Sequence, residues 1–122
     1  MDVRDLYRRW LLELWNGDVG LAGELVTPDF TGHWPRLDVH GPDELAAIVR
    51  QGHAPFTDVS VTLDVGPIVD GDLVAARWTF SGTRDGRRVA FSGHDIVRVS
   101  DGKIAEYWVV SDTEGLAAQL ER

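Results

Sequence analysis

The chain is predicted to fold as an α+β domain whose helices cover one face of an antiparallel sheet. Two patterns indicate this. Apolar residues recur at helical spacing through the first half of the chain, and from residue 59 onward they alternate with polar residues, as in half-buried strands. Asp-Gly pairs, which favour tight hairpins, separate the alternating runs. With 122 residues, the chain fits one domain over residues 1–122.

Helices are expected near both ends of the chain. Residues 2–16 place seven apolar side chains on one face, and Asn16-Gly17 ends that helix. Gly41-Pro42-Asp43-Glu44 is typical of a helix start, with proline and acids in the first turn. The expected helices are residues 2–16, residues 18–26 before Pro28, residues 41–51 and residues 114–120, with a short extended piece at 30–34.

The second half is predicted to form a meander of four strands. Asp70-Gly71, Asp85-Gly86 and Asp101-Gly102 are the expected turns. Two-residue turns would place His94, Tyr107 and Val109 on the outer face. One β-bulge would exchange the two faces beyond it. The face turned toward the helices is predicted to carry Val59, Val61, Leu63, Val65, Val74, Ala76, Trp78, Phe80, Val89, Phe91, Gly93, Asp95, Val97, Trp108, Val110 and Asp112.

Asp95 and Asp112 are the candidate catalytic acids, because both are expected among large apolar side chains. Burying an unpaired carboxylate costs several kcal/mol, which is a large fraction of the total folding stability of a domain, about 5–15 kcal/mol. Each acid is therefore either paired with arginine or backbone donors or faces a cavity, and Asp112 has the further alternative of capping the last helix. In a cavity, burial would raise the carboxyl pKa toward neutrality and permit proton exchange with a substrate. Glu106, near a turn, is expected to be solvated.

Aromatic residues are the candidate walls of an apolar pocket, which would suit a planar apolar ligand; core packing is the alternative. His33, beside a short extended piece, is a candidate base or substrate-binding group, or else a loop histidine bonded to backbone. His94 would take the place of Asp95 if a bulge shifted its strand. The candidate substrate-binding residues are Trp15, Trp34, Trp78, Trp108, Phe91 and Val110.

Composition argues against several classes of function. The net charge of −8 and the pI of about 4.8 disfavour nucleic acid as a partner. No apolar run approaches the roughly 20 residues of a membrane span, and the first residues do not resemble a signal peptide. The chain has no cysteine, which fits the cytoplasm. No metal-binding or cofactor-binding motif occurs, so neither a metal nor a cofactor is expected.

Several segments together resemble a known family. The chain resembles the SnoaL-like polyketide cyclase branch of the nuclear-transport-factor-two-like superfamily, which is related to ketosteroid isomerases and limonene epoxide hydrolases. The matching segments cover nearly the whole chain. They are WNGDVGLAGELVTPDF, GHW, GPDELAAIV, RWTFSGT, GHDIVRVSDGKIAEYWVVSD and GLAAQL.

The resemblance implies a cone-shaped barrel, in which a strongly curved sheet wraps helices around one apolar pocket, commonly in a dimer. It also implies an intramolecular aldol closure without cofactor or metal. Asp112, which ends Trp-x-x-x-Asp, looks like the family's catalytic aspartate, and His33 looks like its pocket histidine. The tight hairpin between Ser81 and Val89 is shorter than in many cyclases, which argues against a large polycyclic substrate.

Two functions follow from these observations. The first is a cofactor-free enzyme that performs acid/base chemistry on a carbonyl compound, as a cyclase or isomerase. In ketosteroid isomerase an apolar site keeps one carboxylic acid protonated as a hydrogen-bond donor, and Asp95 and Asp112 could divide such roles. The alternative is a non-catalytic ligand-binding or dimerisation domain of the same fold. Ile96, Tyr107 and Val109 on the outer face make a homodimer plausible.

Overall fold

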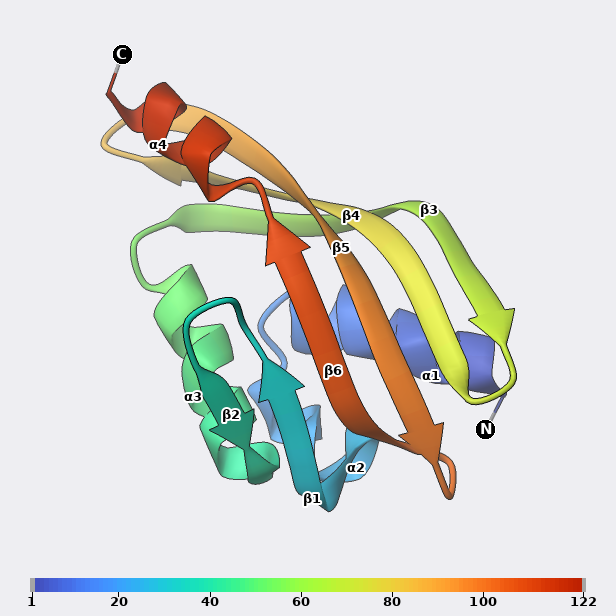
Figure 1. Cartoon of the computed structure of the whole chain (residues 1–122). Coiled ribbons are helices and arrows are strands. Elements are labelled where there is room, and N and C mark those ends of the chain that lie inside the picture. The colour runs from blue at the N-terminus through green and yellow to red at the C-terminus, as the bar shows by residue number, and fades with distance from the viewer. Residues whose placement is uncertain (1, 122) are drawn as a thin grey trace.

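The computed structural model describes residues 2–121 and confirms an α+β fold (Figure 1). Helices come first, a long meander follows, and a short helix ends the chain. The elements in order are α1 (Val3–Arg9), a π-helical turn η1 (Trp10–Leu14), a 3₁₀ turn η2 (Val19–Leu21), α2 (Ala22–Leu25), β1 (Val26–His33), β2 (Asp38–His40), α3 (Gly41–His53), β3 (Thr57–Asp70), β4 (Leu73–Arg84), β5 (Arg87–Ser100), β6 (Lys103–Ser111) and α4 (Thr113–Leu120).

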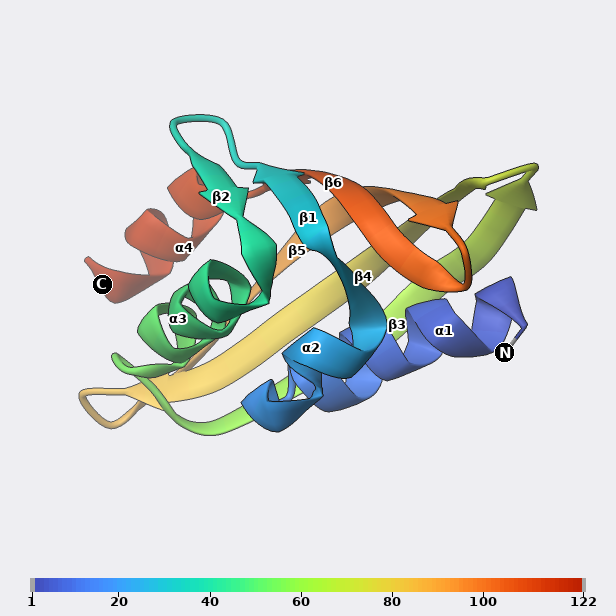
Figure 2. The same cartoon turned by 90° about the horizontal axis from the view of Figure 1, so that it is seen from below.

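One six-stranded sheet, in the order β2-β1-β6-β5-β4-β3, forms the frame of the domain. The sheet is mixed, because β1 runs parallel to β6 while the other neighbours are antiparallel. It is also open, so the α+β fold is as expected, while the parallel β1–β6 pair and the unclosed sheet are details that the sequence did not predict. Figure 2 shows α1, α2 and α3 on the concave side of the sheet, with α4 at one end. None of the helices within residues 2–121 is both long and apolar enough to span a membrane.

The helical segments follow the sequence pattern with two local differences. The first helix starts at its Asp2 cap as an α-helix and continues through the π-helical turn η1. The second ends earlier than expected, because β1 already begins at Val26. Pro28 therefore lies inside β1, in the stretch where the pairing with β6 is irregular, so its missing N–H breaks no regular ladder.

The hairpins confirm the importance of the Asp-Gly pairs. Asp85-Gly86 and Asp101-Gly102 have positive φ angles of 52° and 76° at both turns, as type I′ turns require. The first hairpin differs by one residue, because Asp70 pairs with Leu73 and the turn is Gly71-Asp72.

A β-bulge at Ala105 decides which side chains of β6 face the helices. Val99 pairs with Ile104, but the preceding Arg98 pairs with Glu106, so Ala105 is an extra residue. The bulge exchanges the two faces of β6 beyond this point. The expected inward positions of Trp108, Val110 and Asp112 are therefore wrong. Tyr107, Val109 and Ser111 face inward in their place.

A second irregularity affects β3, where the pairing with β4 shifts between Leu63 and Val65. Val65, expected in the core, is 51% exposed as a result. The β4–β5 pairing is regular and keeps Trp78, Phe80, Val89, Gly93, Asp95 and Val97 on the inner face as predicted. The largest fully buried side chains include Tyr7, Trp10, Leu14, Phe30, Leu45 and Val49.

Candidate functional site

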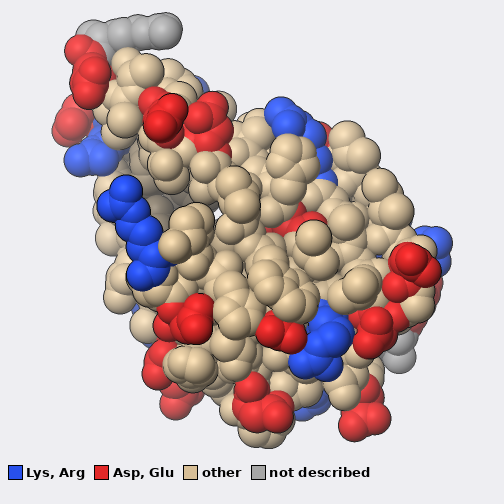
Figure 3. All heavy atoms as spheres, in the orientation of Figure 1, with Lys and Arg blue, Asp and Glu red and all other residues tan. Residues whose placement is uncertain are grey.

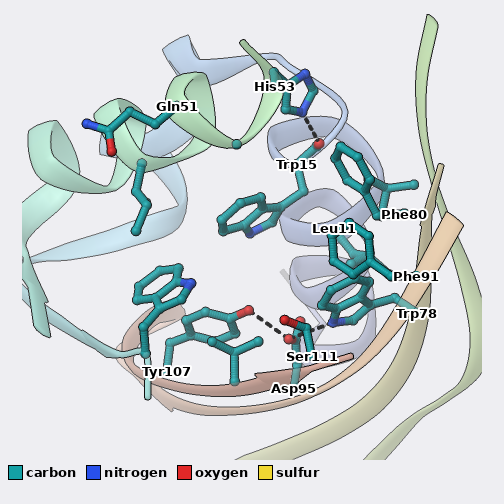
Figure 4. A pocket seen from close by; sticks show the side chains of 15 residues that line it. Leu11, Trp15, Gln51, His53, Trp78, Phe80, Phe91, Asp95, Tyr107 and Ser111 are labelled. Atoms are coloured by element: carbon teal, nitrogen blue, oxygen red, sulfur yellow. Dashed lines mark hydrogen bonds between the residues drawn. The ribbon is translucent and has the colours of Figure 1, made fainter. Parts of the chain in front are cut away.

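A cavity of about 320 Å³ lies between the concave face of the sheet, η1 and α3 (Figure 4). Its volume is at the small end of the range typical of ligand pockets, about 300–1,000 Å³. Six aromatic side chains line it, namely Trp15, Trp34, Trp78, Phe80, Phe91 and Tyr107. The polar lining residues are Gln51, His53, Asp95 and Ser111.

Asp95, on β5, is the only buried charged residue between residues 2 and 121, with 1% of its surface exposed. Three side chains donate hydrogen bonds to its carboxylate. The Tyr7 hydroxyl donates to Oδ2 at 2.8 Å, and Oδ1 accepts from Trp78 Nε1 at 2.8 Å and from the Tyr107 hydroxyl at 2.7 Å. The donors come from α1, β4 and β6, so the acid connects the first helix to the sheet at one wall of the cavity.

Opposing effects act on the pKa of Asp95. Burial raises the pKa, because the charged form loses its hydration, and the hydrogen bonds from Tyr107, Trp78 and Tyr7 lower it. Burial is the larger effect, so the pKa lies above its ordinary value. Burial and the nearby carboxylate also raise the pKa of Tyr7 and of Tyr107. Both phenols therefore remain protonated donors.

Other polar groups at the cavity can bind a ligand. The Trp15 indole projects into the cavity, and its Nε1 is buried with no hydrogen-bond partner in the described part of the chain (Figure 4). Ser111, which pairs with Gly93 on the strand that carries Asp95, also lines the cavity. His53 Nε2 lies 2.7 Å from the carbonyl oxygen of Trp15, so this nitrogen carries a proton and donates. A ligand oxygen would find donors in Trp15 and Ser111.

The predicted inward position of Asp95 is confirmed, and His94 faces outward. Among the candidate pocket walls, Trp15, Trp34, Trp78 and Phe91 do line the cavity. Trp108 and Val110 do not, because the bulge turns them to the outer face, where they are 36% and 66% exposed.

Asp112 lies outside the cavity, contrary to expectation. Its carboxylate caps α4 by accepting a 2.8 Å hydrogen bond from the backbone N–H of Gly115. The side chain is exposed beside Arg77 and His94 on the outer face. The alternative of a helix-capping role is thus confirmed.

His33 also lies away from the cavity. Phe30 and Gly32 are buried positions of β1, and alternation turns His33 outward. Its ring stacks on Trp108 at 5.6 Å, with Nδ1 3.0 Å from Asp38 and Nε2 2.7 Å from Glu106. The bond with Glu106 raises the pKa of His33 and lowers that of Glu106.

Several residues of the site were not among the candidates, including Tyr7, Tyr107, Ser111 and His53. Tyr7 was recognisable as an inward residue of the first helix, but nothing local links it to Asp95, 88 positions away. The bulge concealed Tyr107 and Ser111. His53 ends α3, and only the long-range contact between the end of that helix and the turn after η1 brings it to Trp15.

The model of the SnoaL-like polyketide cyclase family matches residues 5–120. The chain belongs to the SnoaL-like polyketide cyclase family. Among solved structures, TsrD from Streptomyces laurentii is 30% identical, with a TM-score of 0.85 over 98% of this chain and 97% of that one. IdmH from Streptomyces antibioticus, a candidate polyketide cyclase, is 26% identical, with a TM-score of 0.83 over 97% of each chain. Among curated proteins, none is significantly similar to this SnoaL-like chain in sequence.

Another similar structure is a candidate polyketide cyclase from Bacillus cereus ATCC 10987. It is 29% identical, with a TM-score of 0.85, and the match covers 95% of this chain and 78% of that one. TM-scores of 0.83 to 0.85 show that these three structures share the fold of the present chain, so the α+β fold implied by the sequence resemblance is confirmed.

Proposed function

We propose that this SnoaL-like domain is a cofactor-free enzyme that moves a proton on a small apolar carbonyl compound, with Asp95 as the acid/base group. The observation that carries the proposal is the environment of Asp95. Its carboxyl lies at an apolar cavity, it is bonded to neutral donors alone, and its pKa is raised. A carboxyl whose pKa is raised in this way is a stronger base than an ordinary carboxylate and is a candidate for acid/base chemistry.

The proposed first step is the same for both candidate reactions. The Asp95 carboxylate removes a proton from the carbon next to the carbonyl group, and the C–H electrons form an enolate. The enolate oxygen accepts hydrogen bonds from Trp15 Nε1 or the Ser111 hydroxyl, two donors that line the cavity. Tyr7 and Tyr107 hold the carboxylate in place while it gains and returns the proton.

The second step distinguishes cyclase from isomerase. In an aldol closure, the enolate carbon attacks a second carbonyl of the same molecule, and the new alkoxide takes the proton from Asp95. In an isomerisation, Asp95 returns the proton to the conjugated carbon instead. The cavity volume of about 320 Å³ favours substrates of one or two rings for either reaction.

Proton exchange tests the proposal without knowledge of the natural substrate. Ketones of one or two rings, such as 2-tetralone and 1-indanone, are incubated with the protein in D₂O, and NMR follows deuterium uptake at the carbon next to the carbonyl. We expect Asp95→Asn to slow the uptake by about 10²-fold or more, the usual contribution of a general base. Asp64→Asn, an exposed acid of β3, should retain the wild-type rate.

The alternative is a non-catalytic ligand-binding domain. Under this alternative, the same ketones quench the tryptophan fluorescence of the protein. The wild type would then catalyse no more deuterium uptake than Asp95→Asn does. That result would replace the proposed enzyme by a binding protein. The cytoplasmic location and the independence of cofactors remain predictions from the sequence.

We also propose that the outer face of the sheet binds a second copy of this chain. Ile96 and Trp108 pair across β5 and β6 and are 45% and 36% exposed, next to Val110 at 66%. Figure 3 shows few charged side chains over the middle of this face. Trp108→Glu should convert a dimer into a monomer in sedimentation experiments. A wild-type chain that sediments as a monomer would contradict this assembly.

A further inference from the structure

The cavity contains a negative group without a positive partner. Asp95 is bonded to three neutral side chains, Tyr7, Trp78 and Tyr107. Within residues 2–121, no lysine or arginine lines the cavity or forms a salt bridge with Asp95. A buried charge is normally paired with an opposite charge. The ionised carboxylate can therefore be neutralised either by a proton or by a cationic ligand.

Aromatic rings surround the space next to this carboxylate. The Trp34 ring lies 6.2 Å from Trp15 and 5.2 Å from Tyr107. On the other wall, Phe91 lies 5.8 Å from Trp78 and 5.0 Å from Phe80. Figure 4 shows Tyr107 and Trp15 across the cavity from Trp78, Phe80 and Phe91, with Asp95 between them. Aromatic faces attract cations within about 6 Å, and tryptophan attracts them most strongly.

We propose that this cavity binds small alkylated ammonium ions, with the cationic nitrogen held between Asp95 and the aromatic walls. An anionic ligand would meet a carboxylate and no basic residue. A neutral carbonyl compound can bind, but it gains no attraction from the charge of Asp95. An ammonium ion would neutralise the charge of the carboxylate and would also make cation–π contacts with the aromatic rings.

The hydrogen bonds of Asp95 specify how many alkyl groups the ammonium carries. A carboxylate has about four acceptor sites. Three are occupied, two on Oδ1 and one on Oδ2. A primary ammonium brings three N–H donors and would leave most of them unsatisfied in an apolar cavity. A tertiary ammonium needs only one acceptor site, although the buried Trp10 Nε1 also acts as a donor toward this carboxylate, and a quaternary ammonium needs none.

This inference concerns binding and does not depend on catalysis. It extends the proposed function, because an ammonium ion would compete with carbonyl compounds for the same cavity. The acidic chain, with its net charge of −8, would also attract cations from solution.

A matched pair of ligands isolates the effect of charge. 3-Hydroxyphenyltrimethylammonium is a permanent cation, and 3-tert-butylphenol has nearly the same shape without the charge. In calorimetric titrations near pH 8, we expect the wild type to bind the cation at least about tenfold more tightly. Asp95→Asn should abolish this preference and change the affinity for the phenol by less than about threefold. Asp64→Asn should behave as the wild type.

The wild-type protein also provides a test that needs no variant. Protons and the cation compete for Asp95, whose pKa is raised by burial, so the affinity for the cation should fall as the pH is lowered through that pKa, and binding there should release protons. Proton release appears as different binding heats in phosphate and Tris buffers. Tyr7 and Tyr107 stay protonated throughout because their pKa values are raised. His53 also lies at the cavity wall. The variant His53→Gln serves as its control and should keep the pH dependence of cation binding.

Two results would overturn the inference: equal or tighter binding of 3-tert-butylphenol by the wild type, or an affinity for the cation that does not fall when the pH is lowered from about 8 to about 4. Both can be observed even if Asp95→Asn fails to fold. Deuterium uptake by 2-tetralone is measured without the cation, so failure of the ammonium inference and failure of the proposed enzyme are distinguishable.

Discussion

The Tyr107 hydroxyl donates a 2.7 Å hydrogen bond to Oδ1 of Asp95 and joins the last strand to its neighbour at the cavity wall. Tyr107 can do so only because Ala105 is an extra residue in β6. Without this bulge, alternation would place Trp108 on the inner face instead. The environment of the candidate acid therefore depends on one irregularity, ten positions along the chain from it.

Tyr107→Phe removes this hydrogen bond and leaves the ring in place. The free energy of unfolding should fall by about 1.5–3 kcal/mol, as for buried hydrogen bonds to a charged group. The pKa of Asp95 should rise further, because one of the groups that stabilise its ionised form is lost. Urea denaturation at neutral pH measures the first effect. Unchanged stability would show that the bond contributes nothing in solution.

Gly93→Ala tests the packing that positions Trp78. A methyl group on Gly93 would overlap the Trp78 ring, whose Nε1 bonds to Asp95. We expect a loss of about 1–3 kcal/mol, typical of overpacking, and weaker binding of aromatic ketones. Gly23→Ala in α2 is the control, since a methyl there meets nothing within 4 Å. A variant as stable as the wild type would mean that Trp78 moves freely.

His33→Gln tests the outer cluster through its pH dependence. The pKa of His33 is raised above 6.5, so its stabilising effect is complete below that value and is lost as the pH rises through the folded-state pKa. The pKa of Glu106 is lowered below 4.5, so its effect is complete above that value and is lost as the pH falls through the folded-state pKa. Their joint contribution is therefore largest between these two pH values.

The stability lost in His33→Gln should therefore be greatest near pH 5.5 and small above about pH 8.5. Since the pair is partly exposed, the maximum should stay below about 1 kcal/mol. Denaturation of both proteins over this pH range measures the difference. An equal loss at both ends of the range would contradict the charged pairing of His33 with Glu106.

Asp112→Ala should destabilise the domain without affecting chemistry. Removing an N-cap carboxylate costs about 1 kcal/mol. Asp112→Asn should keep the cap, since asparagine caps helices as well as aspartate does. Both variants should exchange deuterium into 2-tetralone at the wild-type rate. A slow Asp112→Asn variant would return Asp112 to the list of catalytic candidates.

Sequence patterns were sufficient for the parts of the fold that depend on local signals. The Asp-Gly turns at 85–86 and 101–102 and the regular β4–β5 pairing place Asp95 on the inner face, as predicted. The helix start at Gly41 follows from Pro42 and the acids after it. These features require only neighbouring residues.

The wrong assignments share a physical origin in long-range packing. Ala105 has no local property that marks a bulge, yet it reverses the orientation of Trp108 and Val110. The parallel pairing of β1 with β6 joins segments far apart in the chain, and it places His33 against Glu106. Period-two patterns predict alternation within a strand, but they cannot locate an extra residue or a distant neighbour.

The pKa of the Asp95 carboxyl tests the central claim most directly. Carbon-13 NMR titration of the aspartate carboxyl groups, with Asp95→Asn to assign the resonance, measures this value in the folded protein. The account predicts a pKa clearly above the ordinary 3.8 and a further change when an aromatic ketone binds. A pKa at or below 3.8 that does not change when the ketone binds would show that Asp95 is a structural, permanently ionised group.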